Sequence, residues 1–195
     1  MPLSLPIATP QLWLFELMSL PFLLLVIRAI SRRPRESGAT RATRSHLGIF
    51  VQGFGIALAG FGPVRSGLPW LGVAAISAYA AIILCVGGAV ALFASCSIAL
   101  GKNWSFEART LTDHELIRSG PYARVRHPIY LGMLLFLLGM AVALGHWVQL
   151  LLAIPMFVVG TRIRTQSEDR LLEQSFGEAF LDYRRSTPAL FPKIP

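Results

Sequence analysis

Charged residues are scarce in this chain. Lysine, arginine, aspartate and glutamate make up 14% of its 195 residues, whereas 54% are hydrophobic. Soluble domains carry about 25% charged residues, so the sequence lacks the charge that an ordinary water-exposed surface requires. This shortage, together with long apolar runs, argues against a soluble domain and predicts an all-α integral membrane protein.

Cysteine is also rare, and histidine is scattered. Cys85 and Cys96 stand eleven positions apart in one apolar run, which is about 16 Å along a helix and beyond the reach of a disulfide. The histidines at positions 46, 114, 127 and 146 show no close metal-ligand spacing. The N-terminus lacks the basic region and cleavage pattern of a signal peptide, so we expect residues 12–27 to remain as a membrane helix. We expect no disulfide and no structural metal.

Four apolar blocks are present: Leu12 to Ile30, Leu47 to Val64, Pro69 to Leu100 and Ile129 to Thr161. About 20 apolar residues cross a 30 Å hydrocarbon core, so each of the first three blocks predicts one span. Gly145-His146-Trp147 interrupts the fourth block and predicts two short antiparallel helices joined at the far interface. The sequence therefore predicts about five transmembrane helices, namely three plus a C-terminal helical hairpin over 129–161.

The basic residues predict the orientation of these helices. Of the 18 lysines and arginines, Arg65 alone lies in the second connection, and the others flank the first loop, the third connection and the tail. Basic loops stay in the cytoplasm, so we expect the N-terminus outside and the C-terminus inside. The tail from Arg162 to Arg185 has apolar residues at helical spacing and predicts a cytoplasmic helix, broken near Gly177 and ended by Thr187-Pro188. This clustering explains the net charge of +8 by topology, and no nucleic-acid partner is expected.

Two polar stretches flank the predicted hairpin. The first runs from Ser119 to Gly132 and contains Arg126-His127-Pro128, which opens an apolar helix. If the hairpin forms, Arg126, His127 and Tyr130 face Arg164, Glu168 and Asp169 in a polar pocket at the membrane edge. The alternative is a basic membrane-flanking turn with interfacial tyrosines, in which Arg164 and Glu168 form a surface i,i+4 pair of small energetic value.

An ordered set of motifs carries a family resemblance. The set is Leu100-Gly-Lys-Asn-Trp-Ser105, Gly120-Pro-Tyr122, Arg126-His-Pro-Ile-Tyr-Leu-Gly132, Glu168-Asp-Arg-Leu-Leu172 and Phe176-Gly-Glu-Ala-Phe-Leu-Asp-Tyr183. It resembles the isoprenylcysteine carboxyl methyltransferase family, in particular its bacterial branch. The resemblance implies an S-adenosylmethionine-dependent methyltransferase of a prokaryotic inner membrane, with a lipophilic acceptor entering from the lipid bilayer. It divides the chain into helices 1 to 3 with their basic loop (1–100) and a cofactor-binding and catalytic region (101–195).

The resemblance also implies roles for individual residues. Arg126, Arg164 and Glu168 would be catalytic, the arginines orienting an acceptor carboxylate such as that of an isoprenylcysteine. The cofactor would contact Tyr122, His127, Pro128, Tyr130, Gly132, Glu168 and Tyr183, with Trp104 as a further aromatic candidate. The family pattern has two glutamates where this chain has Glu168-Asp169. The alternatives are phospholipid N-methylation, a nicotinamide-dependent reductase of the sterol-reductase type, and a non-catalytic binding protein or permease.

Overall fold

The computed structural model describes residues 9–31, 40–41, 43–101, 109–110 and 115–192. The helices of this part of the chain are α1 (Pro10–Ser31), α2 (Thr43–Gly60), α3 (Val73–Leu100), α4 (Pro128–Leu144), α5 (Leu150–Phe176) and α6 (Glu178–Ser186). A 3-10 turn, η2, covers Gly120–Ala123, and the two-residue strands β1 (Thr40–Arg41) and β2 (Arg109–Thr110) pair antiparallel. The predicted helical architecture is confirmed. Trp104 lies outside the described residues.

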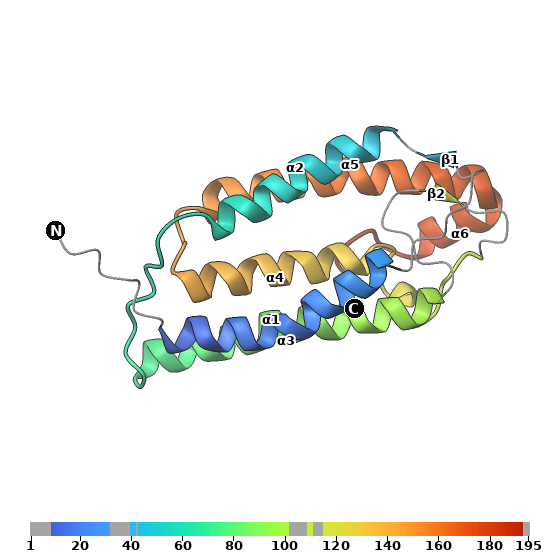
Figure 1. Ribbon diagram of the computed structural model, residues 1–195. Coiled ribbons are helices and arrows are strands. Elements are labelled where there is room, and N and C mark those ends of the chain that lie inside the picture. The colour runs from blue at the N-terminus through green and yellow to red at the C-terminus, as the bar shows by residue number, and fades with distance from the viewer. Residues whose placement is uncertain (1–8, 32–39, 42, 102–108, 111–114, 193–195) are drawn as a thin grey trace.

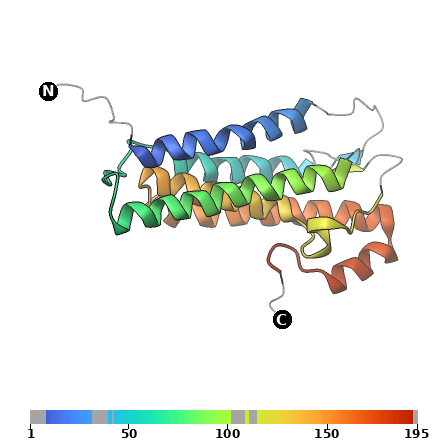
Figure 2. The same ribbon diagram turned by 90° about the horizontal axis from the view of Figure 1, so that it is seen from below.

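The five long helices lie lengthwise beside one another (Figure 1). α5 packs along α2, while α1 and α4 pack along α3. At one end of the bundle, here called the tail end, α4 begins and α6 folds back on one side (Figure 2). At the opposite end, the loop end, α2 connects to α3 and α4 connects to α5.

Two helices, α1 and α3, are long and apolar enough to cross a membrane, and α4 and residues 45–60 of α2 are shorter apolar helices. Large apolar side chains cover the outer surface of the bundle: Phe50 is 73% exposed, Leu84 73%, Ile98 82% and Leu151 73%. An exposed apolar surface of this kind is typical of a protein that contacts lipid or a partner.

The second helix of the C-terminal hairpin continues beyond the apolar block. It runs without a break from Leu150 to Phe176, so the helix expected after Arg162 leaves the last apolar block directly and ends at Gly177. It packs mainly against α2, so the hairpin partners α4 and α5 are held together chiefly through neighbouring helices and near the tail end. The chain reverses between α5 and α6 at Gly177, whose φ of 52° favours glycine.

Buried apolar clusters connect the helix pairs. One joins Phe22 of α1, Phe93 of α3 and Tyr122 of η2, and another joins Ala59 of α2 to Leu137 of α4 and Phe157 of α5. α4 contributes to both sides, because Phe136 packs on the first cluster and Leu137 belongs to the second. The middle of α4 therefore packs against both groups of helices.

Close approach of α2 and α5 depends on glycine. A Cβ atom added to Gly160 would lie 2.4 Å from the backbone nitrogen of Gln52, and one added to Gly48 would lie 2.6 Å from Cγ of Arg164. Real side chains do not tolerate such distances from a backbone atom, so α2 and α5 pack with their backbones nearly touching. This contact places Gln52 directly beside the residues of α5 that precede the tail end.

Candidate functional site

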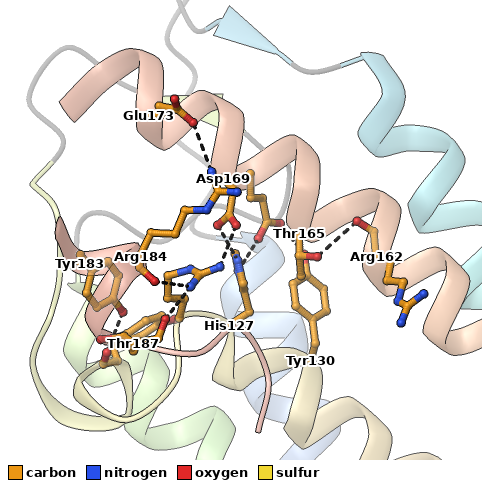
Figure 3. Close-up of polar contacts among 12 residues, drawn as sticks. His127, Tyr130, Arg162, Thr165, Asp169, Glu173, Tyr183, Arg184 and Thr187 are labelled. Carbon is orange, nitrogen blue, oxygen red and sulfur yellow. Dashed lines mark hydrogen bonds and ion pairs between the residues drawn. The ribbon is translucent and has the colours of Figure 1, made fainter. Parts of the chain in front are cut away.

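Polar side chains from the start of α4 and from α5 meet at the tail end of the bundle, where Figure 3 labels His127, Tyr130 and Asp169. We call five of these residues the carboxylate cluster: Arg126, His127, Tyr130, Glu168 and Asp169. Pro128 occupies the first position of α4, where its missing N–H costs nothing, and His127 precedes it as the N-cap residue. The residues that meet in the cluster are 38 to 43 positions apart in the sequence.

His127 lies between the two carboxylates. Its Nδ1 is 3.2 Å from Oε2 of Glu168 and its Nε2 is 2.9 Å from Oδ1 of Asp169, while its side chain is 4% exposed. Both ring nitrogens face acceptors, so both act as donors when the ring is a cation. Burial on its own lowers the pKa of His127, but the hydrogen bonds to Asp169 and Glu168 outweigh it and raise the pKa to about 9.

The carboxylates respond in the opposite direction. Burial favours the neutral form of Glu168 and Asp169, yet the hydrogen bonds and charge of His127 dominate and hold both pKa values below their ordinary range. Arg164 contributes to the shift at Glu168, and Arg126 contributes at Asp169. The cluster therefore holds two carboxylate anions and an imidazolium cation at neutral pH.

Arg126 ties the cluster to the C-terminal segment, residues Thr187–Ala189. Its Nη2 donates to Oδ2 of Asp169 at 3.0 Å, and its Nη1 donates to the carbonyl oxygens of Arg184 and Thr187. The backbone N–H groups of Arg126 and His127 donate to the carbonyls of Pro188 and Ala189 at 2.8 and 2.9 Å. The Nε of Arg126 is buried and has no hydrogen-bond partner within the described part of the chain.

Arg164 lies on α5 one turn closer to the loop end than Glu168. Its guanidinium carbon is 5.0 Å from the ring centroid of Tyr130, whose hydroxyl donates to Oε1 of Glu168. Its Nη1 donates to Oε1 of Gln52 at 2.9 Å. The side chain is thus held between α2 and the cluster, with 5% of the residue exposed.

The structure brings the six residues of the predicted pocket together, and the remaining expected residues lie around them. Tyr122 is buried below the cluster, and its carbonyl accepts a hydrogen bond from the Tyr183 hydroxyl at 2.6 Å. Gly132 faces α3, because a Cβ added there would lie 3.5 Å from the carbonyl of Ala89. Pro128 is buried at the helix start. Gly132, Tyr122 and Tyr183 therefore make packing contacts that hold the cluster in place.

Two features of the site are absent from the sequence prediction. The C-terminal segment was expected only to end the tail helix, yet its backbone carbonyls bind Arg126 and His127. Gln52 lies within an apolar block, and its contact with Arg164 spans 112 sequence positions. Neither contact has a local signal, although an amide inside an apolar block is a general reason to look for a buried partner.

Metal binding is not indicated by the part of the chain that the structure describes. Within the described ranges, no group of three or more histidine, cysteine, aspartate or glutamate residues is arranged to hold a metal ion. In the cluster, the histidine nitrogens and the carboxylate oxygens are directed at one another and at arginine.

Comparison with protein families agrees with the motifs. The model of the phospholipid methyltransferase family matches residues 76–179, which is more than half of the chain and includes the start of α4 and all of α5. The chain therefore belongs to the phospholipid methyltransferase family.

Individual relatives support the narrower resemblance. A Protein-S-isoprenylcysteine O-methyltransferase of Schizosaccharomyces pombe is 32% identical over 114 residues, covering 57% of this chain and 48% of the yeast protein. One from Rattus norvegicus is 28% identical over 137 residues, covering 69% of this chain and 45% of the rat protein. The Cobalt-zinc-cadmium resistance protein CzcN of Cupriavidus metallidurans is 41% identical over 85 residues, covering 42% of this chain and 38% of that protein. The predicted resemblance to isoprenylcysteine methyltransferases is confirmed, and the matched segment spans less than half the length of each of these relatives.

Proposed function

We propose that this chain is an S-adenosylmethionine-dependent membrane methyltransferase that methylates the carboxylate of a lipophilic acceptor of the isoprenylcysteine kind. The observation that carries the proposal is the position of Arg164 relative to the carboxylate cluster. Glu168 follows Arg164 by four positions on α5, which is a rise of about 6 Å along the helix axis. An acceptor that enters between apolar helices meets Arg164 first, whereas a polar cofactor reaches Glu168 and Asp169 from the tail end.

The donor set of the cluster fits the amino-acid portion of this cofactor. Glu168 and Asp169 are ionised acceptors for its ammonium group, and the buried Nε of Arg126, which has no partner among the described residues, is a donor for its carboxylate. When bound, the cofactor would supply an electrophilic methyl group on a sulfonium. The residues of this chain would hold the reacting groups in line and exclude water.

The two arginines have different roles in this proposal. Arg126 donates to the Asp169 carboxylate and to the carbonyls of Arg184 and Thr187, so it organises the cluster. Arg164 orients the acceptor carboxylate through a guanidinium whose planar donors match two oxygens, a geometry that lysine does not offer. A carboxylate is already ionised near pH 7 and requires no general base.

Amine methylation is the second candidate, because the matching family model is described as phospholipid methyltransferase. An amine acceptor needs a base to remove its proton. The His127 ring is held as a cation between two carboxylates with a pKa of about 9, and the pKa of Glu168 is lowered. At neutral pH the His127 ring therefore already carries its proton, and the Glu168 carboxylate is a weak base, so the electrostatics favour a carboxylate acceptor.

The topology is part of the proposal. We infer five membrane crossings, by α1, α2, α3, α4 and the apolar first half of α5, with the tail end in the cytoplasm of a prokaryotic inner membrane. The positions of the basic residues and the bacterial character of the motifs support this orientation. Reporter fusions after residues 66 and 192 should report opposite sides of the membrane.

Titration of S-adenosylmethionine into the detergent-purified chain by calorimetry tests the cofactor. Saturable binding is expected for the wild type, and it should be lost in Glu168→Ala, which removes the carboxylate that accepts from His127 Nδ1 and from the Tyr130 hydroxyl. Arg126→Ala should likewise abolish turnover. Helical circular dichroism checks that both variants remain folded. Normal turnover in both folded variants would refute the site, and methylated ethanolamine headgroups in the lipids of expressing cells would favour the amine reaction.

A further inference from the structure

A buried polar chain leads from the middle of α2 to the carboxylate cluster. Gln52 and Thr161 are each 1% exposed, and Nε2 of Gln52 donates to Oγ1 of Thr161 at 2.7 Å. Oε1 of Gln52 accepts from Nη1 of Arg164 at 2.9 Å. Buried polar groups between apolar helices are costly unless they are hydrogen-bonded, so this arrangement calls for an explanation.

The chemistry of the side chains fixes the orientation of the Gln52 amide. A guanidinium only donates hydrogen bonds, so the amide oxygen must face Arg164 and the amide nitrogen must face Thr161. The Thr161 hydroxyl accepts from the amide, which prevents the amide from turning over. Gln52 is therefore held in one orientation, with its acceptor directed at Arg164.

The backbone contact between α2 and α5 makes this reach possible. Added Cβ atoms at Gly160 and Gly48 would collide with the Gln52 backbone and with the Arg164 side chain, so both glycines keep α2 within reach of Arg164. From there the guanidinium extends over the Tyr130 ring, 5.0 Å from its centroid. The Tyr130 hydroxyl donates to Glu168, so the chain of contacts ends in the cluster.

We infer that Gln52 is a positioning residue that aims the Arg164 guanidinium at the acceptor carboxylate. This role rests on the proposed function. An amide suits this role better than a carboxylate. The neutral amide oxygen holds one guanidinium nitrogen in place and does not neutralise the positive charge that binds the carboxylate of the methyl acceptor. A glutamate at position 52 would pair with Arg164 and compete with the acceptor.

Binding of two farnesylated probes to the full-length chain tests the role. The probes are S-farnesylcysteine and its carboxamide, which differ only in the carboxylate, and affinity is measured by calorimetry without turnover. The wild type should prefer the acid. Gln52→Leu should weaken acid binding roughly 10- to 100-fold, the loss expected when a charge-assisted hydrogen bond to the acid is no longer formed, and should leave amide binding unchanged. Gln52→Glu should lose the preference as well, although it retains an acceptor for Arg164.

Gln11→Leu is the matched control. Gln11 is also fully buried, at the loop end, where its Nε2 donates to the Pro69 carbonyl at 3.4 Å. The control should lower the melting temperature but retain the acid preference. If Gln52→Leu also lowers only the melting temperature, or if Gln52→Glu behaves like the wild type, the positioning role is overturned. Equal binding of acid and amide by the wild type would instead overturn the carboxylate acceptor, and with it this role.

Discussion

The two ends of the bundle each bury a histidine, and the two histidines have different partners. At the tail end, His127 faces Glu168 and Asp169. At the loop end, Nδ1 of His146 is 2.9 Å from the carbonyl of Ala59, and its Nε2 is 3.0 Å from the carbonyl of Pro63. Both histidines are buried, so the two sites differ in the charge of the histidine's partners and not in burial.

The loop end is organised around a chain reversal. Gly145 adopts a φ of 72°, and an added Cβ would lie 2.7 Å from the backbone nitrogen of Ser66. The Ser66 hydroxyl donates to the Ala143 carbonyl at 2.6 Å, and the Arg65 N–H donates to the Leu144 carbonyl at 2.8 Å. His146 joins these contacts by linking the end of α2 to the turn before α5. Both of its ring nitrogens face backbone carbonyls.

Removing the tail-end histidine should have the largest effect. His127→Ala leaves Glu168 and Asp169 close together without the cation between them, so the cluster should open. We expect methyl transfer per folded molecule to fall roughly 100-fold or more, as for the loss of a preorganised polar group in other enzymes. A radiolabelled methyl-transfer assay with a farnesylated acid measures this. If His127→Ala keeps activity within a few-fold of the wild type, His127 is not needed for methyl transfer. The two buried histidines would then not differ in function.

Removing the loop-end histidine should affect stability and not chemistry. His146→Ala leaves the buried carbonyl of Ala59 and the partly buried carbonyl of Pro63 without the imidazole, which costs about 1–3 kcal/mol. The melting temperature in detergent should drop, while kcat at a temperature where the variant is folded stays at the wild-type value. A His146→Ala variant with normal stability and impaired turnover would contradict this prediction, because it would place a functional residue at the loop end.

The pH dependence of stability should come from the tail end. The pKa of His127 rises from 6.5 to about 9 on folding. The folded state therefore binds the proton more tightly, and this stabilisation is complete below pH 6.5 and is lost as the pH rises through about 9. The melting temperature of the wild type should decline between about pH 6.5 and 9. The decline should be weaker in His127→Ala, and an equal decline in the variant would exclude His127 as its source.

An exposed ion pair beside the site should matter least. Arg185 and Asp182 of α6 are 2.7 Å apart, and their side chains are 68% and 67% exposed. Water and salt screen such pairs, so Arg185→Ala should change the free energy of unfolding by less than about 0.5 kcal/mol and leave turnover unchanged. Chemical denaturation measures the first quantity. A large loss of stability or turnover in Arg185→Ala would mean that an exposed charge near the cluster matters as much as a buried one.

Much of the helical structure follows from the sequence because it is local. The apolar block from Leu12 to Ile30 corresponds to α1, and the glycine at position 177 marks the end of α5. The approach of Arg126 and His127 to Glu168 and Asp169 was also predictable, since α4 and α5 are consecutive and antiparallel. Helical spacing then places residues near the start of one helix beside those toward the end of the next.

Contacts between distant helices could not be predicted in the same way. The pairing of α2 with α5, and not of α4 with α5, depends on which small residues meet, and Gly48 and Gly160 are far apart in the chain. The backbone bonds from Arg126 and His127 to Pro188 and Ala189 are independent of side-chain identity at the accepting positions. No residue pattern encodes them, so the sequence could not show that the C-terminal segment closes the site.

That C-terminal segment has a consequence for biosynthesis. A ribosome that has reached Ser186 has already produced every helix described in the structure, but the carbonyls of Pro188 and Ala189 that bind Arg126 and His127 are still missing. Every described helix is therefore synthesised before the carboxylate cluster has its last backbone partners. The cluster is completed only after the chain has passed the end of α6.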